Sequence, residues 1–108
     1  MSLEGINEKD WKLFRKKMPE WQERYMGRLC DEYAEILNRD VNPSDKFWVL
    51  FERLKKDSYD VGVNAEMSRS KMHRNIASLV SEGAITIDDM DGFSEEMREY
   101  VKACMERE

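Results

Sequence analysis

Apolar side chains recur every three or four residues along five stretches of the chain, and this spacing predicts amphipathic α-helices. The first helix should begin after Asn7, whose side chain can cap the exposed amide groups with Asp10 as a capping-box partner. Pro19 removes one backbone hydrogen bond wherever it lies inside a helix. The first helix therefore either ends near Lys17, with a second helix over about 19–38, or continues through a kink at the proline.

The second half of the chain carries the start and stop signals of three further helices. Asn42 followed by Pro43 predicts a third helix that continues to about Asp57, because asparagine caps a helix and proline suits its first position. A fourth helix should begin at a serine and end at a glycine, after which a short capped turn and a fifth helix complete the chain. The residues concerned are Ser68 or Ser70, Gly83, Thr86 with Asp89, and Ser94.

The apolar stripes of these helices should meet in one core. This predicts an all-α fold, a compact bundle of four to five amphipathic helices with the segment 19–38 at its centre. A chain of 108 residues has the size of one domain, so we expect a single helical domain over 1–108, with residues 1–6 flexible or partly a cloning remnant. The side chains expected in the core include Trp11, Trp21, Cys30, Phe47, Trp48, Leu50, Phe51, Leu54, Ile76, Tyr100 and Cys104.

The charge of the chain bounds its partners and its location. The net charge is -5, and residues 83–108 carry the excess, with 3 basic and 8 acidic side chains. An acidic chain is poorly suited to nonspecific nucleic-acid binding, which requires neutralisation of phosphates. No apolar run is long enough to cross a membrane, and no signal peptide is visible. We therefore expect a soluble cytoplasmic protein that does not bind a membrane.

No pattern in the sequence is specific for catalysis, a cofactor or a metal. His73 is the only histidine, and the usual spacings of zinc ligands are absent. The acidic run from Asp88 to Asp91 does not match a calcium loop, because with Gly92 as the sixth loop residue the first ligand would be Ile87. We assign no catalytic, cofactor-binding or metal residues and expect no enzymatic activity.

The start of the fourth helix is the one segment with a candidate binding chemistry. Residues 68–85 resemble the recognition helix of helix-turn-helix regulators, with small polar residues first, basic residues on one face, and an apolar stripe that ends in glycine and isoleucine. That motif needs a preceding turn of about 3–4 residues, and the connection from Asp57 to Ser68 is longer. The simpler alternative is an amphipathic helix with a basic first turn and a solvated histidine. The residues that would contact phosphates and base edges are Arg69, Lys71, His73, Arg74 and Asn75.

A second resemblance extends over nearly the whole chain. The segments that carry it are Asp10-Trp11-Lys12-Leu13-Phe14-Arg15, Trp21-Gln22-Glu23, Tyr25-Met26, Asn42-Pro43-Ser44, Lys46-Phe47-Trp48 and Met67-Ser68-Arg69-Ser70. They are similar to segments of a small uncharacterised family of acidic helical proteins from anaerobic bacteria, whose members are sometimes labelled multidrug transporters. That label does not fit this sequence, because short amphipathic helices cannot span a bilayer unaided. The resemblance implies a natural compact domain and supplies no residue roles.

Good foldability without a chemical signature favours a small, non-catalytic cytoplasmic interaction or regulatory module. Its partner would be another protein or a second copy of the chain, with aromatic side chains buried between the copies. The alternative is a nucleic-acid-binding regulator that uses the basic start of the helix at about 69–82. No cofactor is expected.

Overall fold

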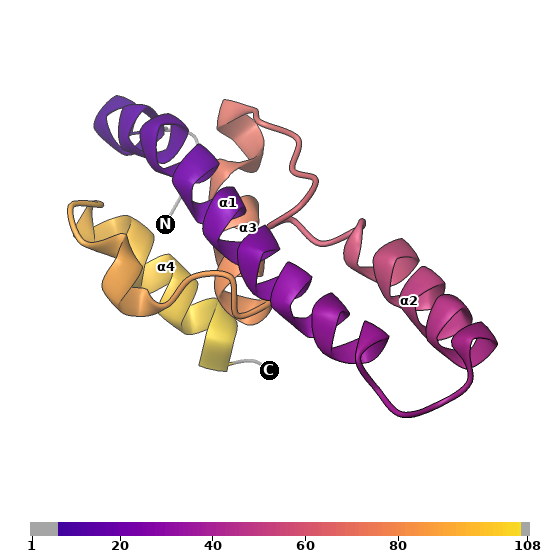
Figure 1. Ribbon diagram of the computed structural model, residues 1–108. Helices are drawn as coiled ribbons and strands as arrows, with labels where there is room; N and C mark the ends of the chain where they lie inside the picture. Colours follow the sequence, from indigo (N-terminus) through magenta and orange to yellow (C-terminus); the bar gives the residue numbers. More distant parts are fainter. Residues whose placement is uncertain (1–6, 107–108) are drawn as a thin grey trace.

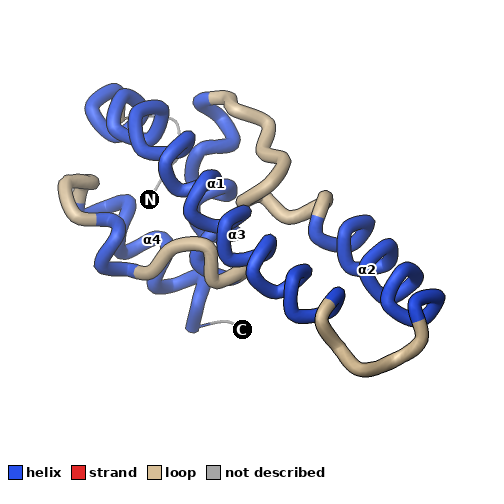
Figure 2. Tube along the Cα trace, viewed as in Figure 1, coloured by secondary structure: helices blue, strands red, loops and turns tan. Residues whose placement is uncertain are grey.

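The computed structural model describes residues 7–106, so the expectation for residues 1–6 lies outside the described part of the chain. Four α-helices and two short 3-10 helices follow one another, and no strand occurs within this range (Figures 1 and 2). The prediction of an all-α fold is confirmed. The elements are α1 (Glu8–Leu37), α2 (Pro43–Asp57), η1 (Arg69–Lys71), α3 (Met72–Ser81), η2 (Ile87–Met90) and α4 (Glu95–Glu106).

The first two predicted helices are one continuous helix, α1, of 30 residues. The Asn7 side chain caps it as predicted, accepting hydrogen bonds from the amides of Lys9 (2.9 Å) and Asp10 (3.1 Å). Pro19 lies inside the helix on an exposed face, where water can reach a carbonyl that lacks an amide partner. At about 1.5 Å per residue, α1 is roughly 45 Å long and sets the long dimension of the molecule, which is 54 Å.

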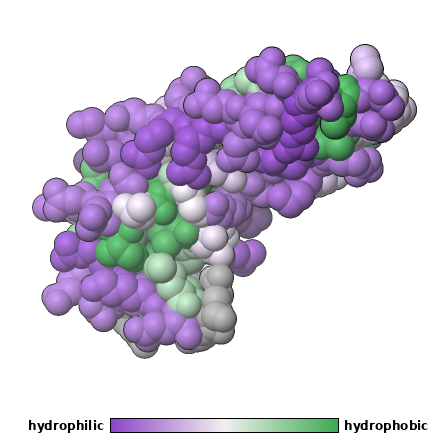
Figure 3. All heavy atoms as spheres, turned by 60° about the horizontal axis from the view of Figure 1, so that its bottom comes forward, coloured by the Kyte–Doolittle hydropathy of each residue, from purple (hydrophilic) through white to green (hydrophobic). Residues whose placement is uncertain are grey.

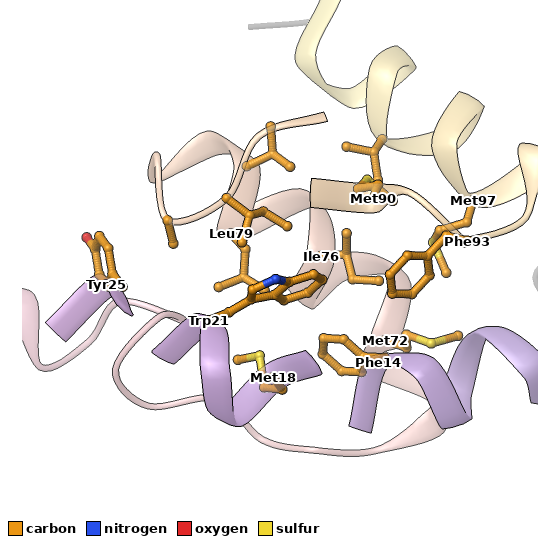
Figure 4. Packing of buried hydrophobic residues seen from close by; sticks show 14 of the residues in the cluster. Phe14, Met18, Trp21, Tyr25, Met72, Ile76, Leu79, Met90, Phe93 and Met97 are labelled. Carbon is orange, nitrogen blue, oxygen red and sulfur yellow. The ribbon is translucent and has the colours of Figure 1, made fainter. Parts of the chain in front are cut away.

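The hydrophobic core lies between the N-terminal two thirds of α1 and the pair of α3 and α4 (Figure 4). Phe14, Ile76 and Leu79 are fully buried, and the ring of Trp21 stacks on Phe93 at a centroid distance of 6.1 Å. Among the described residues, this core contains no side chain from α2. Its buried members are Trp11, Phe14, Met18, Trp21, Tyr25, Leu29, Met72, Ile76, Leu79, Val80, Ala84, Ile85, Met90, Phe93, Met97 and Val101.

Polar contacts tie α1 to the C-terminal half of the chain. The Arg28 guanidinium donates a 2.7 Å hydrogen bond to the carbonyl of Gly83, which ends α3 with a φ of 80° as glycine readily does. Arg24 pairs with Asp89 at 2.9 Å, and Asp89 also closes the predicted capping box with Thr86 at the start of η2. Helix α4 begins after a serine, as predicted.

Several predictions about burial are wrong, chiefly in α2. Phe47, Trp48, Phe51 and Leu54 are exposed, because α3 and α4 already fill the core and α2 lies beside the C-terminal part of α1 alone (Figure 1). The molecule is consequently more extended than a compact bundle, with extents of 54 × 28 × 22 Å.

Three smaller expectations also fail. Cys30 is exposed and Cys104 half-buried, and both are free thiols. His73, expected in solvent, is buried between α3 and α4, where its ring meets Tyr100 edge-on at 5.3 Å. Asp10 does not complete a capping box with Asn7, because its carboxylate binds Ser94 at the start of α4 instead.

Candidate functional site: the apolar face of the helical hairpin

The C-terminal third of α1 and the whole of α2 form an antiparallel hairpin that extends away from α3 and α4 (Figures 1 and 2). Residues 38–42 connect the two helices. Asn42 occupies the N-cap position of α2, and its carbonyl accepts hydrogen bonds from the amides of Asp45 and Lys46, although its side chain makes no capping bond. Pro43 takes the first helical position as the sequence predicts.

The side of α2 that faces α1 is mostly polar. The Asp57 carboxylate is almost fully buried there and accepts a 2.6 Å hydrogen bond from the Tyr33 hydroxyl of α1. Arg53 bridges the two helices, with one nitrogen 2.6 Å from Glu32 of α1 and 3.3 Å from Asp57. Helical spacing of three and four residues thus turns the least exposed positions of α2 towards α1, and these are Lys46, Leu50, Arg53 and Asp57.

Two tyrosine–aspartate pairs anchor the end of the hairpin. In addition to the pair of Tyr33 and Asp57, the Tyr25 hydroxyl donates a 2.6 Å hydrogen bond to Asp60 just beyond α2. Burial, and then the hydrogen bond to its aspartate, raises the pKa of each tyrosine hydroxyl above its ordinary value. Both phenols therefore stay protonated and act as permanent donors, which makes these contacts structural.

The outward side of α2 is apolar. Phe47, Trp48, Phe51 and Leu54 are 61, 59, 45 and 47% exposed. The ring of Trp48 meets Phe47 and Phe51 edge-on at centroid distances of 5.0 and 5.7 Å, so the three rings form one cluster. A cluster of large aromatic side chains in water is unusual for a surface that has no partner.

Helix α1 contributes an uncharged strip to the same side of the hairpin. Met26, Cys30 and Tyr33 line a groove of about 260 Å³ together with Leu54 of α2, and Leu37, 49% exposed, continues the strip one turn further. We call the combined surface the hairpin face. Its members are Met26, Cys30, Tyr33 and Leu37 of α1 and Phe47, Trp48, Phe51 and Leu54 of α2.

The eight residues of the hairpin face are uncharged, although the Asp57 carboxylate also lines its groove, and the border of the face carries both signs. Helical spacing places the exposed Glu52 next to Trp48, and the ammonium of Lys55 lies 5.7 Å from the centroid of the Phe51 ring. In Figure 3, green hydrophobic residues lie open at the narrow end of the molecule among purple hydrophilic ones. The electrostatic character of this surface is therefore neutral at the centre and mixed at the rim.

The five residues proposed for nucleic-acid contact do not form one exposed basic surface. Arg69 pairs with Glu8 at 3.1 Å and lies over the Trp11 ring, and Lys71 pairs with Glu66 at 2.6 Å. Asn75 is buried and donates a hydrogen bond to the carbonyl of Glu66. His73 is buried as well, and of the five residues only Arg74 both belongs to α3 and is exposed.

The surroundings of the basic segment also differ from those of a recognition helix. Helix α2 ends at Asp57 and η1 begins at Arg69, so the preceding connection is far longer than the turn of about 3–4 residues that the motif needs. Nucleic-acid binding stays a prediction, and its direct check is salt-sensitive affinity for DNA that falls in the Arg69→Ala, Lys71→Ala and Arg74→Ala variants.

His73 is a buried histidine with one ring nitrogen that makes no hydrogen bond to the described residues. Its Nδ1 atom is buried and makes no hydrogen bond within residues 7–106. Burial lowers the pKa of its imidazole below the ordinary value, although the nearby Asp10 and Glu96 act in the opposite direction. A neutral imidazole packed against a ring edge fits a core position and not a ligand site.

Within the described part of the chain, no cluster of three or more histidine, cysteine, aspartate or glutamate side chains could hold a metal ion. None of the helices over residues 7–106 combines the length and the apolar character needed to cross a membrane. The chain matches no family model, no curated protein and no solved structure.

The sequence of α2 contains two rows of residues with helical spacing, and only one of them is apolar throughout. On α2, the positions 46, 50, 53 and 57 and the positions 47, 51 and 54 both have helical spacing, and the second set is the apolar one. A stripe pattern predicts that an apolar side is covered, but not by which molecule. The strip on α1 is detectable in the same way, because between Met26 and Leu37 every charged residue avoids one side of the helix.

Proposed function

We propose that this chain is a protein-interaction module that binds through the hairpin face. The observation that supports the proposal most directly is that a cluster of aromatic and aliphatic side chains remains exposed beside a core that is already complete. Apolar residues of irregular loops are often exposed because nothing holds them in place. Phe47, Trp48 and Phe51 lie instead on a regular helix that a buried hydrogen bond holds against α1. A partner can therefore bind this surface without a change in the fold.

The size of the surface supports the same function. With about 150–250 Å² for each large side chain, the exposed parts of Leu37, Phe47, Trp48, Phe51 and Leu54 amount to roughly 500 Å². Patches of this size on a monomer commonly mark an interaction site. At about 25 cal/mol per Å², covering it is worth roughly 12 kcal/mol, which is comparable with the roughly 4–15 kcal/mol that association itself costs. A stable complex therefore requires a partner that buries apolar area of its own.

The chemistry of the hairpin face defines that partner. A neutral centre with aromatic anchors favours an apolar surface over a charged peptide or a nucleic acid. The spacing of the exposed residues, four and then three apart, suits the side chains of another helix, which insert between such rows. The expected partner surface is one or two amphipathic helices.

A matched pair of surface variants tests the proposal. Trp48→Glu/Phe51→Glu places charges on the hairpin face, whereas Val49→Glu places one on the opposite side of the same helix, where Val49 is 41% exposed. All replaced side chains are exposed, so circular dichroism should show that both variants remain folded. Tagged protein, captured from a lysate and analysed by quantitative mass spectrometry, should retain the same binders in wild type and Val49→Glu and lose them in the double variant. Identical recovery from all three proteins would contradict the proposal.

A further inference from the structure

We infer that the hairpin face is covered by the hairpin face of a second copy of this chain, so that two hairpins form a four-helix bundle in a homodimer. The inference rests on the proposed function and identifies its partner. Pairs of amphipathic helices with one open side commonly complete their core in this way, and two-fold dimers are the most frequent oligomers.

The spacing of the exposed side chains is that of helices in a bundle. Along α1 the strip advances from Met26 to Cys30, Tyr33 and Leu37, which are steps of four, three and four residues. Along α2 it advances from Phe47 to Phe51 and Leu54, which are steps of four and three. Alternating steps of three and four produce one continuous seam on each helix, and such seams interlock with equivalent seams of a partner.

The available area meets the requirement of a specific dimer. Two copies together cover roughly 1,000 Å² from the five most exposed apolar side chains of each, which is the lower bound for a specific interface. The groove beside Met26, Cys30 and Tyr33 adds further apolar surface from each copy. The total therefore lies at the lower end for a specific interface, just below the range of about 1,200–2,000 Å² that stable complexes bury.

The charges of the hairpin are compatible with self-pairing. A face that recognised a strongly charged partner would carry charge of one sign, and two copies of it would repel each other. Here the eight residues of the face are uncharged, and the border carries Glu52 as well as Lys55. Two copies can therefore meet without bringing a block of like charges together.

The shape of the molecule leaves room for the second copy. The hairpin extends beyond the body that α3, α4 and the first half of α1 form (Figures 1 and 3). If the two-fold axis of the dimer is perpendicular to the helices of the hairpin, the bodies of the two copies lie at opposite ends of the four-helix bundle and do not collide. The dimer would therefore be an elongated particle.

Sedimentation velocity and light scattering of the pure, full chain test the inference. Wild type and Val49→Glu should change from the 12.9 kDa monomer to twice that mass as the concentration rises through the micromolar range. Trp48→Glu/Phe51→Glu should weaken the dimer by at least about 100-fold, because it buries charges at the centre of the interface. The double variant should stay monomeric while its circular dichroism spectrum is unchanged.

A chemical readout locates the interface independently. Cys30 lies on the hairpin face, whereas the half-buried Cys104 of α4 lies on the body and serves as an internal reference. Iodoacetamide should alkylate Cys30 more slowly as wild type dimerises, while the rate at Cys104 stays constant. In the double variant, the rate at Cys30 should not depend on concentration.

Each outcome separates this inference from the proposed function. A wild type that remains monomeric at about 100 µM overturns the homodimer. If the monomer still captures other proteins through a face that the double variant lacks, the interaction module stands and only the identity of its partner is wrong. If all three proteins dimerise equally, the copies meet through another surface, and the inference fails.

Discussion

Replacing Asp10 tests whether one buried carboxylate holds the start of α4 against the first turn of α1. Its two oxygens accept hydrogen bonds from the Ser94 amide at 2.8 Å and the Ser94 hydroxyl at 2.6 Å, across 84 positions of sequence. The Asp10 side chain is only 2% exposed, and Ser94 is the residue from which α4 begins. The contact therefore positions the whole of α4 against the first turn of α1.

The magnitude follows from the two hydrogen bonds. A hydrogen bond to a charged group contributes about 1.5–3 kcal/mol, and the half-buried Ser94 can recover part of this loss from water. We expect Asp10→Ala to lower the free energy of unfolding by about 2–4 kcal/mol, a large part of the roughly 5–15 kcal/mol typical of a domain. Asp10→Asn keeps one acceptor oxygen and should lose about half as much.

Urea unfolding at pH 7, followed by circular dichroism, measures these values. Asp45→Ala is the matched control, because Asp45 also lies in the first turn of a helix but is exposed, so its loss should cost about 0.3–1 kcal/mol. In a double-mutant cycle, Asp10→Ala and Ser94→Ala should be less than additive by about 1–2 kcal/mol. If Asp10→Ala is no more destabilising than Asp45→Ala, the contact does not stabilise the fold.

Three further predictions follow from the burial of other residues. Because the folded state lowers the pKa of His73 below its unfolded value of 6.5, the unfolded state takes up a proton first as the pH falls, and the fold is destabilised from about pH 6.5 down to the folded pKa. The free energy of unfolding should therefore decrease as the pH falls below about 6.5, and an equal decrease in His73→Gln would contradict this origin. Gly62→Ala should destabilise the fold by about 1–3 kcal/mol in urea unfolding, because the added methyl group would lie 2.4 Å from the Tyr25 ring, and an unchanged midpoint would show that the ring moves freely. Ile76→Ala, at a fully buried position, should cost about 2–5 kcal/mol, whereas Phe51→Ser in dilute protein should change stability by less than about 0.5 kcal/mol; similar losses for the two would place Phe51 in the core.

The hairpin face has one practical consequence for work on this protein. Exposed aromatic side chains on a regular helix promote association, so the apparent stability of wild type should depend on its concentration once copies pair. Stability measurements therefore need to be made at a stated, low concentration. The Trp48→Glu/Phe51→Glu variant provides a monomeric reference for the intrinsic stability of the fold.

Local sequence determined the helices and most of their ends. Asn7 caps α1, Pro43 opens α2, Gly83 ends α3, and Thr86 with Asp89 closes a capping box, as the short-range chemistry of these residues requires. These features depend on hydrogen bonds and backbone angles within a few residues, so no knowledge of the tertiary structure is needed to expect them. The apolar stripes of α3, of the first two thirds of α1 and of most of α4 likewise predicted which sides are buried, whereas Cys30 and Leu37 of the α1 stripe are exposed.

Tertiary structure alone decided which stripes found a partner within the chain. Pro19 could end a helix or lie within one, and the choice depends on the core that α3 and α4 build along one side of a continuous α1. The stripe of α2 has the same helical spacing as the buried ones, yet three helices already close the core, and Asp57 and Arg53 hold the polar side of α2 against α1 instead. Periodicity records that a surface avoids water, but only the arrangement of all the helices shows whether this chain or another molecule covers it.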